Sequence, residues 1–502
     1  MCQVHFKAAD APVTRLAADA LEGAWRQETE TVGSSSGRGS GGGFANDLRA
    51  PVITLQETRS RGDRDVPIIL RDGAIYDREL DRFFRDLPAN GARSRHTLRA
   101  YGYDIMLWVR FLSDARGKTV WRADRDDVLA YHRARRRCAA AHRISASSWN
   151  RAIASLDKLY SWALDETLVR VSPFRRRTVW RRGRGGRTGQ VAARNLSYEM
   201  TPRRADIALV TMPEFRRFCD VGLRGFTADG DYRPGARDRN GGRNALFAEL
   251  LFGTGLRLEE ASSLFAMEIG SPPSRGPLRV RLATRLTKGD KGRTIIVPRS
   301  VVASLRRYIE LERTIAVAAF RARERWEAFD ALFCRRSSAR SATLVSAHGE
   351  RISLDEFTPE ERLRVVLIDA RGRPLEPAAL WLSEIGLPVA PNSWEKVFER
   401  ASERCARSKF RIKVTPHQLR HAFAVHMLAM LIRKTIGDAD ERDPSSAAYR
   451  RLLGDPLHTV QRLLGHASIE TTYIYLDHLA GLQDTVDQAV EELLGPSVEA
   501  AA

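Results

Sequence analysis

Six side chains that can bind a phosphate or move a proton occur in four short segments of the second half of the sequence. They are Arg257 in GTGLRLEE, Lys288 in TKGDKGR, His417 and Arg420 in TPHQLRHAFAVHML, and His466 and Tyr475 in LLGHASIETTYIYLDH. A planar guanidinium can donate two aligned, charge-assisted hydrogen bonds to a phosphate, and phosphoryl transfer builds negative charge on the non-bridging oxygens. The set is therefore suited to chemistry on a phosphate.

The same residues do not form a recognisable metal site or nucleotide-binding loop. Carboxylate ligands are missing from the set. His417 and His421 have the spacing of a helical zinc pair, but Gln418 stands where a zinc protease needs its glutamate base. The sequence contains no GxxxxGK[ST] loop. Zinc hydrolysis, and ATP-driven chemistry through that loop, are therefore disfavoured.

The local pattern predicts the elements that must hold Arg257. A helix over 244–252 is expected to stop at the glycines of GTG, so that Arg257 opens the next helix beside the apolar Leu258. Glu260 lies three residues after Arg257, on the same helical face, and could orient it. A surface ion pair at a helix start would give the same local sequence.

The other candidates fall on a hairpin and on two further segments. Residues 278–298 cluster β-formers around a glycine-containing turn and predict a β-hairpin, with Lys288 at the strand end. A lysine there is merely solubilising unless another motif supplies its target. A proline near a helix start precedes His417 and Arg420, whose three-residue spacing lets both face the same direction. His466 lies nine residues before Tyr475.

The composition favours an anionic partner. The 502 residues include 82 Lys and Arg against 62 Asp and Glu, a formal net charge of +20. Nucleic acid is a better partner than a membrane, because the longest nearly apolar run, 421–432, is about a dozen residues and a spanning helix needs about 20. Without a secretory signal, the chain is expected to be cytoplasmic and associated with the nucleoid. Five scattered cysteines without a CxxC pair argue against a disulfide framework.

The first third of the chain divides into a weakly ordered region and a helical one. Residues 1–75 are expected to be poorly ordered or variable, whereas 76–174 follow a helical pattern. Two apolar faces recur at helical spacing, one on a helix that begins near Ser94. They are Leu98, Tyr101, Ile105, Trp108 and Leu112, and Trp149, Ile153, Leu156, Tyr160 and Ala163. These faces are expected to form the core of a small helical bundle.

Residues 175–205 are interpreted as a basic interdomain linker. The segment VSPFRRRTVWRRGRGGR, 171–187, contains no acid, and a phosphate backbone neutralises such a run without requiring a fixed conformation. A solvated linker or a processing site is the alternative. The residues expected to contact DNA are Arg175, Arg176, Arg177, Arg181, Arg182, Arg184 and Arg187.

Taken in order, the four blocks resemble the tyrosine recombinases of the phage integrase family. The resemblance covers about 206–478, and more loosely 76–174, which is similar to the family's core-binding domain. It implies a mainly α fold with a small antiparallel β-sheet. A helical, SAM-like core-binding domain over 76–174 would precede a catalytic domain over 206–495. The intervals between the blocks are long, so insertions are expected near 335–391 and 434–456.

The resemblance also implies a role for each candidate on the phosphate. Tyr475 is the implied nucleophile, which attacks a DNA phosphodiester and leaves a 3′-phosphotyrosyl bond and a free 5′-hydroxyl. Tyr473 is a nearby competitor for that role. Arg257 and Arg420 are the implied clamps on the non-bridging oxygens, and Glu260 supports the first of them.

The remaining implied roles are proton transfers. Lys288 protonates the departing 5′-oxygen, His417 assists transfer of the tyrosine proton, and His466 donates to the phosphate. Because the covalent link conserves the phosphodiester energy, neither a cofactor nor a metal is expected.

The implied function is site-specific recombination of double-stranded DNA, such as integration or excision. A relaxing type IB topoisomerase and a catalytically silent DNA-binding relative remain as alternatives. Exchange of two duplexes requires four cleavages, so a homo-oligomer is expected, a tetramer on paired sites, with accessory proteins as further candidates. An amphipathic helix over 482–493 either packs on its own domain or docks on a neighbouring protomer.

Overall fold

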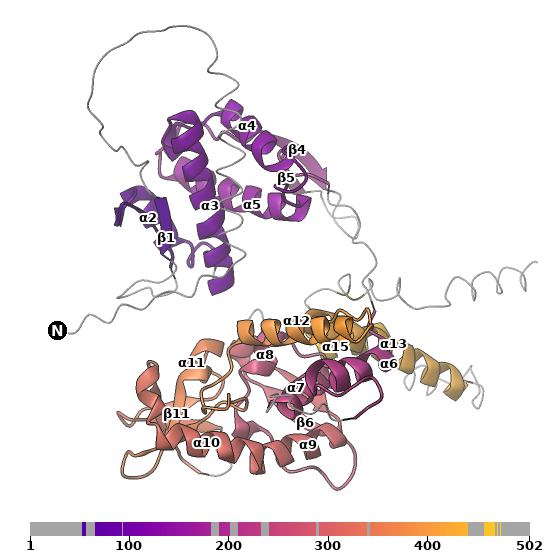
Figure 1. The fold of residues 1–502 in the computed structure, drawn as a ribbon. Coiled ribbons are helices and arrows are strands. Elements are labelled where there is room, and N and C mark those ends of the chain that lie inside the picture. Colours follow the sequence, from indigo (N-terminus) through magenta and orange to yellow (C-terminus); the bar gives the residue numbers. More distant parts are fainter. Residues whose placement is uncertain are drawn as a thin grey trace, which may run out of the picture. The chain divides into compact units, whose positions relative to one another are not determined.

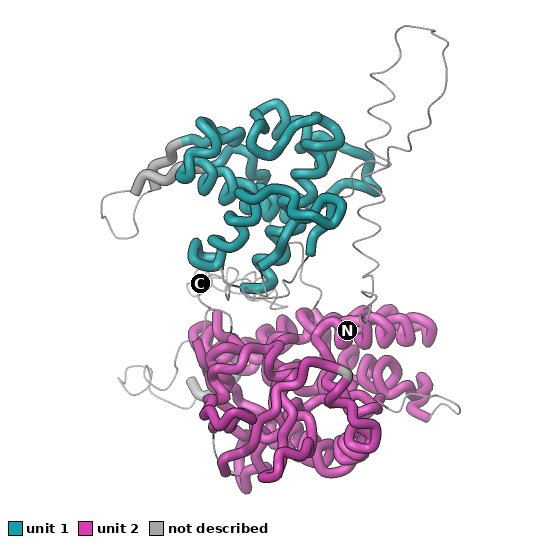
Figure 2. Tube along the Cα trace, turned by 90° about the vertical axis from the view of Figure 1, so that its left-hand side faces the viewer, with its two compact units in different colours: residues 1–204 teal, residues 205–502 magenta. Residues whose placement is uncertain are grey.

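The computed structural model describes residues 53–56, 66–92, 94–181, 190–200, 209–231, 240–287, 291–338, 342–439, 456–466, 469 and 472. The chain divides into two compact units, 1–204 and 205–502 (Figure 2). The described residues are mainly α-helical, with small sheets. No helix among them is long and apolar enough to cross a membrane. The helix predicted over 482–493 lies outside the described residues.

Unit 1 is a helical bundle with short strands. Its elements are β1 (Ile53–Gln56), β2 (Ile68–Arg71), β3 (Ala74–Ile75), α2 (Arg78–Asp86), α3 (Arg95–Arg116), a 3₁₀ turn (Val120–Arg122), α4 (Arg125–Arg136), α5 (Ala146–Asp165), β4 (Arg176–Arg181) and β5 (Gln190–Asn195) (Figure 1). Helix α3 begins after Ser94, as predicted. The two predicted apolar faces meet in the core, where Trp108 Nε1 donates to the Tyr160 hydroxyl over 2.9 Å.

The prediction that residues 1–75 are poorly ordered is wrong for β1, β2 and β3. These strands form an antiparallel sheet in that order. Ile53 and Ile69 are buried in the unit's core, and Arg110 Nε of α3 donates to the Ile53 carbonyl over 2.8 Å. Strands of two to four residues show too little alternation to be recognised in a sequence, and packing on a helix is what stabilises them.

The linker prediction for 175–205 is wrong for β4 and β5. The two strands pair antiparallel, with Arg177 opposite Arg194. The chain that follows β5 is tied to unit 1, because Trp149 Nε1 of α5 donates to the Ser197 carbonyl over 2.8 Å. A run of arginines carries no strand signal, and its pairing partner follows only after a glycine-rich segment.

Unit 2 combines helices with two sheets. Its elements are α6 (Met212–Arg217), a π-helical turn (Phe218–Leu223), α7 (Gly241–Thr254), α8 (Leu258–Ser262), a 3₁₀ turn (Ala266–Glu268), β6 (Leu278–Leu282), a 3₁₀ turn (Thr284–Leu286), β7 (Arg293–Val297), α9 (Arg299–Glu310), α10 (Glu312–Ala322), a 3₁₀ turn (Arg325–Ala328), β8 (Leu332–Arg336), β9 (Thr343–Ser346), β10 (Arg351–Ser353), α11 (Pro359–Arg364), β11 (Val365–Ile368), β12 (Pro374–Pro377), α12 (Pro391–Arg407), α13 (Pro416–Ala439) and α15 (Pro456–Leu464). The hairpin predicted over 278–298 is confirmed by the antiparallel pairing of β6 with β7.

The residues where an insertion is predicted, 335–391, contribute most of a second sheet. Its strand order is β10-β9-β8-β11-β12, and β8 pairs parallel with β11. A five-stranded mixed sheet was not expected beside the hairpin. Arg362 of α11 ties it to the rest of unit 2, since this fully buried guanidinium donates to both carboxylate oxygens of Glu268. Of the second predicted insertion, 434–456, only the end of α13 and Pro456 are described.

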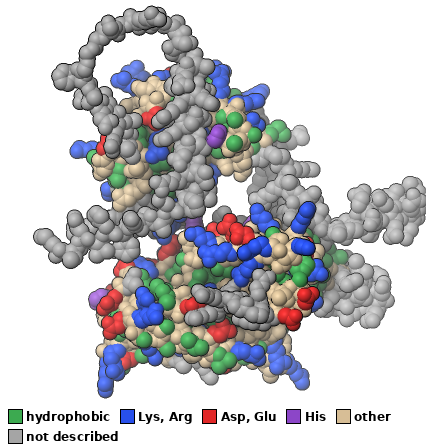
Figure 3. Space-filling view, viewed as in Figure 1, with side chains coloured by type: hydrophobic (Ala, Val, Ile, Leu, Met, Phe, Trp, Pro, Cys, Tyr) green, Lys and Arg blue, Asp and Glu red, His purple; other side chains and the backbone are tan. Residues whose placement is uncertain are grey.

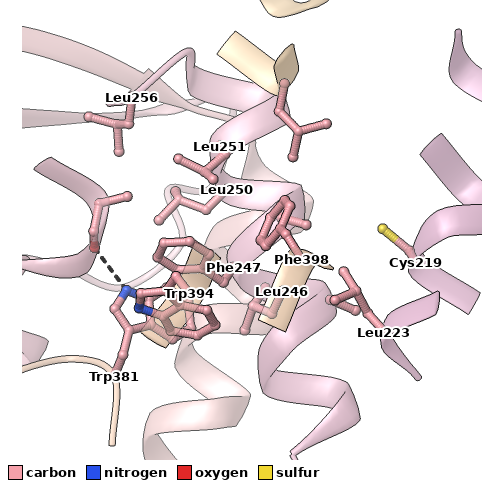
Figure 4. Packing of buried hydrophobic residues seen from close by; sticks show 14 of the residues in the cluster. Cys219, Leu223, Leu246, Phe247, Leu250, Leu251, Leu256, Trp381, Trp394 and Phe398 are labelled. Atoms are coloured by element: carbon pink, nitrogen blue, oxygen red, sulfur yellow. Dashed lines mark hydrogen bonds between the residues drawn. The ribbon is translucent and has the colours of Figure 1, made fainter. Parts of the chain in front are cut away.

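The core of unit 2 fixes the end of α7 and the start of α8. Phe247 of α7 stacks on Trp394 of α12 with ring centroids 3.7 Å apart (Figure 4). Trp381 Nε1 donates to the Ala261 carbonyl in α8 over 2.9 Å, the hydrogen bond drawn as a dashed line. Leu256, between the two helices, is fully buried. The residue that follows it, Arg257, is therefore held on a rigid part of the fold.

The turn at Gly255 requires glycine. Its φ is +65°, and a Cβ there would lie 2.3 Å from Cδ1 of Phe423 and 2.9 Å from Cδ2 of Leu464. We predict that Gly255→Ala lowers the free energy of unfolding by about 2 kcal/mol or more. Gly349 is the matched control, because its φ is +89° and nothing lies within 4 Å of its Cβ position. Gly349→Ala should cost about 1 kcal/mol; equal losses in urea unfolding would contradict the close approach at Gly255.

Candidate active site

Arg257 is the residue immediately before α8, and both its backbone and its side chain donate hydrogen bonds to Glu260. The backbone N–H of Arg257 donates to Glu260 Oε2 over 2.8 Å, and Arg257 Nη1 donates to Glu260 Oε1 over 2.9 Å. The Glu260 side chain is only 1% exposed. One buried carboxylate thus fixes both the main chain and the guanidinium of Arg257.

Arg420 joins the segments that carry two other candidates. It is buried on α13, where its Nη1 donates to the Gly255 carbonyl and its Nη2 donates to the Leu464 carbonyl over 2.7 Å. Gly255 lies two residues before Arg257, and Leu464 lies two residues before His466. The guanidinium of Arg420 therefore brings three segments that are distant in the sequence to one place.

His466 is a neutral ring beside positive charges. The pKa of His466 is lowered to about 4, and burial is the largest cause. The charges of Arg420, Arg257 and Arg293, in that order, act in the same direction. His466 Nδ1 lies 3.0 Å from Thr472 Oγ1. In the tautomer whose Nδ1 accepts from that hydroxyl, Nε2 carries the proton and is a donor.

The low pKa of His466 predicts a loss of stability in acid. Between about pH 6.5, the unfolded pKa, and about pH 4, the unfolded chain binds more protons than the folded chain, so the free energy of unfolding falls as pH falls. From pH 7 to pH 4.5 the unmodified protein should lose about 2 kcal/mol more than His466→Gln. Urea unfolding at both pH values measures this difference. An equal loss in both proteins would show that the His466 pKa is ordinary.

Glu260 also binds an arginine that the sequence analysis did not single out. Arg293 Nη1 donates to Glu260 Oε1 over 2.8 Å and Arg293 Nη2 donates to Glu260 Oε2 over 2.6 Å. Arg293 is the last residue of TKGDKGR, and a polar residue after a turn is normally solvated. The signal that could have identified Arg293 is the register of the hairpin. Arg293 pairs with Leu282, which is fully buried, and paired residues lie on the same face of the sheet. Thr472 was missed as well, since a hydroxyl before the candidate tyrosines has no distinctive spacing.

The described part of the site carries a net positive charge. Burial raises the pKa of Glu260, but the hydrogen bonds and charge of Arg293, together with the charge of Arg257, outweigh it and hold the pKa below its usual value. Glu260 is thus ionised at neutral pH. Among the described residues, the charges of three guanidinium groups act on His466, and the carboxylate of Glu260 offsets one of them. Such a cluster is suited to an anionic ligand.

The other predicted site residues are less well placed. His417 lies on α13 one turn before Arg420, but it is exposed, and its ring packs edge-on against His421 with centroids 4.2 Å apart. Three of the candidates lie outside the described residues: Lys288, which falls between β6 and β7 in the sequence, Tyr473 and Tyr475. Within the described residues, no group of three or more His, Cys, Asp or Glu could hold a metal ion.

Two protein-family models and several known proteins are similar to this chain. The model of the phage integrase N-terminal SAM-like domain matches residues 80–167, and the phage integrase family model matches residues 235–433. Tyrosine recombinase XerD of Ralstonia nicotianae is 26% identical over 399 residues, which are 79% of this chain and 88% of the relative. Tyrosine recombinase XerC of Rhodospirillum centenum is 27% identical over 413 residues, 81% of this chain and 85% of the relative.

Solved structures match this chain at lower sequence identity. The pre-cleavage complex of XerH site-specific recombinase with difH substrate matches with a TM-score of 0.41 and 15% identity, over 78% of this chain and 79% of that one. A lambda integrase dimer bound to a COC′ core site matches with a TM-score of 0.39 and 14% identity, over 79% of this chain and 75% of that one.

Proposed function

We infer the roles of the site residues from one premise: this chain belongs to the phage integrase family of tyrosine recombinases. It is a site-specific DNA recombinase, an enzyme that cleaves DNA strands and rejoins them. We propose that Tyr475 forms the covalent link to DNA. The observation that supports this proposal best is the pair of hydrogen bonds from Arg420 to the Gly255 and Leu464 carbonyls, which gathers Arg257 and His466 around one centre.

In the proposed mechanism the described residues bind the phosphate. Arg257 and Arg420 donate to the non-bridging oxygens, and His466 donates from Nε2. Because His466 is neutral at pH 7, its donated hydrogen bond does not add a fourth positive charge to the cluster. The donors are already fixed by protein contacts, so little reorganisation is needed as negative charge grows in the transition state.

The bond changes are assigned to Tyr475, Lys288 and His417. The Tyr475 oxygen attacks phosphorus, the P–O5′ bond breaks, and its electron pair leaves with the 5′-oxygen, which takes a proton from Lys288. His417 accepts the tyrosine proton. A free tyrosine has a pKa near 10, so at neutral pH it needs such a base and the nearby cations to attack. Religation reverses the same steps.

We propose that both units contact duplex DNA. The match at 80–167 supports a core-binding domain over 76–174, and the match at 235–433 supports a catalytic domain over 206–495. Lys and Arg side chains are spread over both units in Figure 3, interspersed with carboxylates.

The seven arginines between Arg175 and Arg187 are assigned to the DNA backbone. Arg175 and Arg177 are exposed, which supports this assignment. Arg176 has a protein partner, since its Nη2 lies 2.9 Å from Asp157 Oδ1, and this ion pair also ties β4 to α5. Nothing is described of the side chains of the remaining members of the proposal, Arg181, Arg182, Arg184 and Arg187.

The proposed assembly is a tetramer on paired DNA sites. Exchange of two duplexes requires four cleavages, and each protomer supplies one nucleophile. The helix predicted over 482–493 is the proposed docking element between protomers. Accessory proteins are further candidates for partners.

Trapping of the covalent intermediate tests this function. The probe is a duplex carrying a site that the purified protein selects from random-sequence DNA, with a nick near the scissile bond so that the released fragment diffuses away. A protein–DNA adduct that survives denaturation is expected. A bound site without an adduct would favour the silent relative, whereas relaxation of supercoiled DNA that lacks the site would favour a topoisomerase.

A further inference from the structure

We propose that Arg293 is a positioning residue for DNA cleavage, which acts on Arg257 through Glu260. The inference rests on the proposed function. It adds to that function a residue that touches neither the phosphate nor the nucleophile in the mechanism above. Its basis is a cluster of two guanidinium groups on one buried carboxylate.

The hydrogen bonds of this cluster are distributed evenly. Oε1 of Glu260 accepts from Nη1 of Arg257 and Nη1 of Arg293, at 2.9 and 2.8 Å. Oε2 accepts from the backbone N–H of Arg257 and Nη2 of Arg293, at 2.8 and 2.6 Å. Arg293 thus fixes both oxygens of the carboxylate in the orientation in which each also holds Arg257.

The charges of the cluster give Arg293 a second effect. Without Arg293, the ion pair of Arg257 and Glu260 would be neutral, and the carboxylate would compete with a phosphate for the Arg257 guanidinium. With Arg293 present the three groups carry a net charge of +1. Because the Glu260 side chain is 1% exposed and that of Arg293 is 9% exposed, water screens these charges weakly. Arg257 therefore keeps more of its attraction for an anionic ligand.

Arg293 also lies beside the His466 segment and close in sequence to Lys288. It opens β7, five residues after Lys288 in the sequence. Its Cδ lies 3.0 Å from where a Cβ on Gly465 would be, beside His466. Arg293 thus links the hairpin, Arg257 and the His466 segment.

The chain offers a matched control. Arg313 of α10 is also buried, at 4% exposure, and pairs with Glu376 and with main-chain carbonyls of β12 and the residues after it. It holds the second sheet to the helices and contacts none of the candidate site residues. Loss of Arg313 should therefore lower the Tm without changing the chemistry.

The test compares Arg293→Gln, Arg293→Lys and Arg313→Gln in the full chain. For each we would measure the Tm, the Kd for the selected DNA site and the single-turnover rate constant of adduct formation. Arg293→Gln should slow cleavage by about 10- to 100-fold while changing Kd by less than about threefold. Arg293→Lys should recover part of the rate, because it restores the charge. The double variant with Glu260→Gln should be about as slow as the slower single variant.

A second readout does not depend on activity. Removing the Arg293 charge should raise the NMR titration midpoint of His466 above about 4, whereas Arg293→Lys and Arg313→Gln should leave it unchanged. A folded Arg293→Gln protein that cleaves at the unmodified rate would overturn the inference, as would the same slowing in Arg313→Gln. If the unmodified chain forms no adduct, the proposed function fails. The His466 midpoint then decides the inference alone, and an unchanged midpoint refutes it.

Discussion

Tyr475→Phe is expected to abolish the covalent adduct on the nicked duplex, lowering the rate constant of its formation by at least about 10³-fold. The variant removes one oxygen, and with it the nucleophile, but keeps the aromatic ring. DNA binding should persist, because the charged side chains remain. Tyr473→Phe is the matched control, since it makes the same change two residues away. Adduct formation is measured on denaturing gels and the linked residue is identified by mass spectrometry.

The two tyrosine variants exchange their outcomes if the nucleophile is misassigned. An adduct that persists in Tyr475→Phe and vanishes in Tyr473→Phe would move the nucleophile to Tyr473. An adduct that persists in both single variants would place the nucleophile on another residue altogether.

Arg257→Lys is expected to slow adduct formation by about 10²- to 10³-fold, with Kd for DNA changed by less than about threefold. Lysine keeps the positive charge and hence the attraction for DNA. It cannot donate to Glu260 and also present two aligned donors to a phosphate, as a guanidinium does. Single-turnover kinetics and a binding isotherm separate the two effects.

Arg306→Lys is the control for this exchange. Arg306 forms an ion pair with Glu310 on the surface of α9, with Nη2 2.8 Å from Oε1, and takes no part in the candidate site. Its replacement should leave the cleavage rate unchanged. If Arg257→Lys also cleaves at the unmodified rate, Arg257 does not clamp the phosphate.

The elements that could be predicted from the sequence are those with enough residues to show a period. Helices α3 and α5 each bury a face that repeats at helical spacing, and the β6–β7 hairpin combines β-formers with a glycine-containing turn. The strands β1 to β3 and the five-stranded sheet could not be found in this way. Each has strands of two to five residues, and their stability comes from packing on helices that are distant in the sequence.

The candidate site was predictable in its residue types and in one contact, but not in its other contacts. Arg257 and Glu260 are three residues apart at a helix start, so their contact was expected, although Arg257 has extended backbone and Glu260 meets it as the third residue of the helix in a capping box. The partners of Arg420 are main-chain carbonyls in two remote segments, and a carbonyl has no sequence signature. Arg293 was missed for a related reason. Its side chain faces the protein interior because Arg293 pairs with buried Leu282, and this pairing register is known only from the structure.

A crystal structure of the full chain bound to its selected DNA site would test the central claim most directly. One phosphate should accept hydrogen bonds from both Arg257 and Arg420, at donor–oxygen distances of about 2.7–3.1 Å. The Tyr475 oxygen should face that phosphorus from the side opposite the 5′-oxygen. Guanidinium groups that bind two different phosphates, or that point away from the DNA, would contradict a shared cleavage centre.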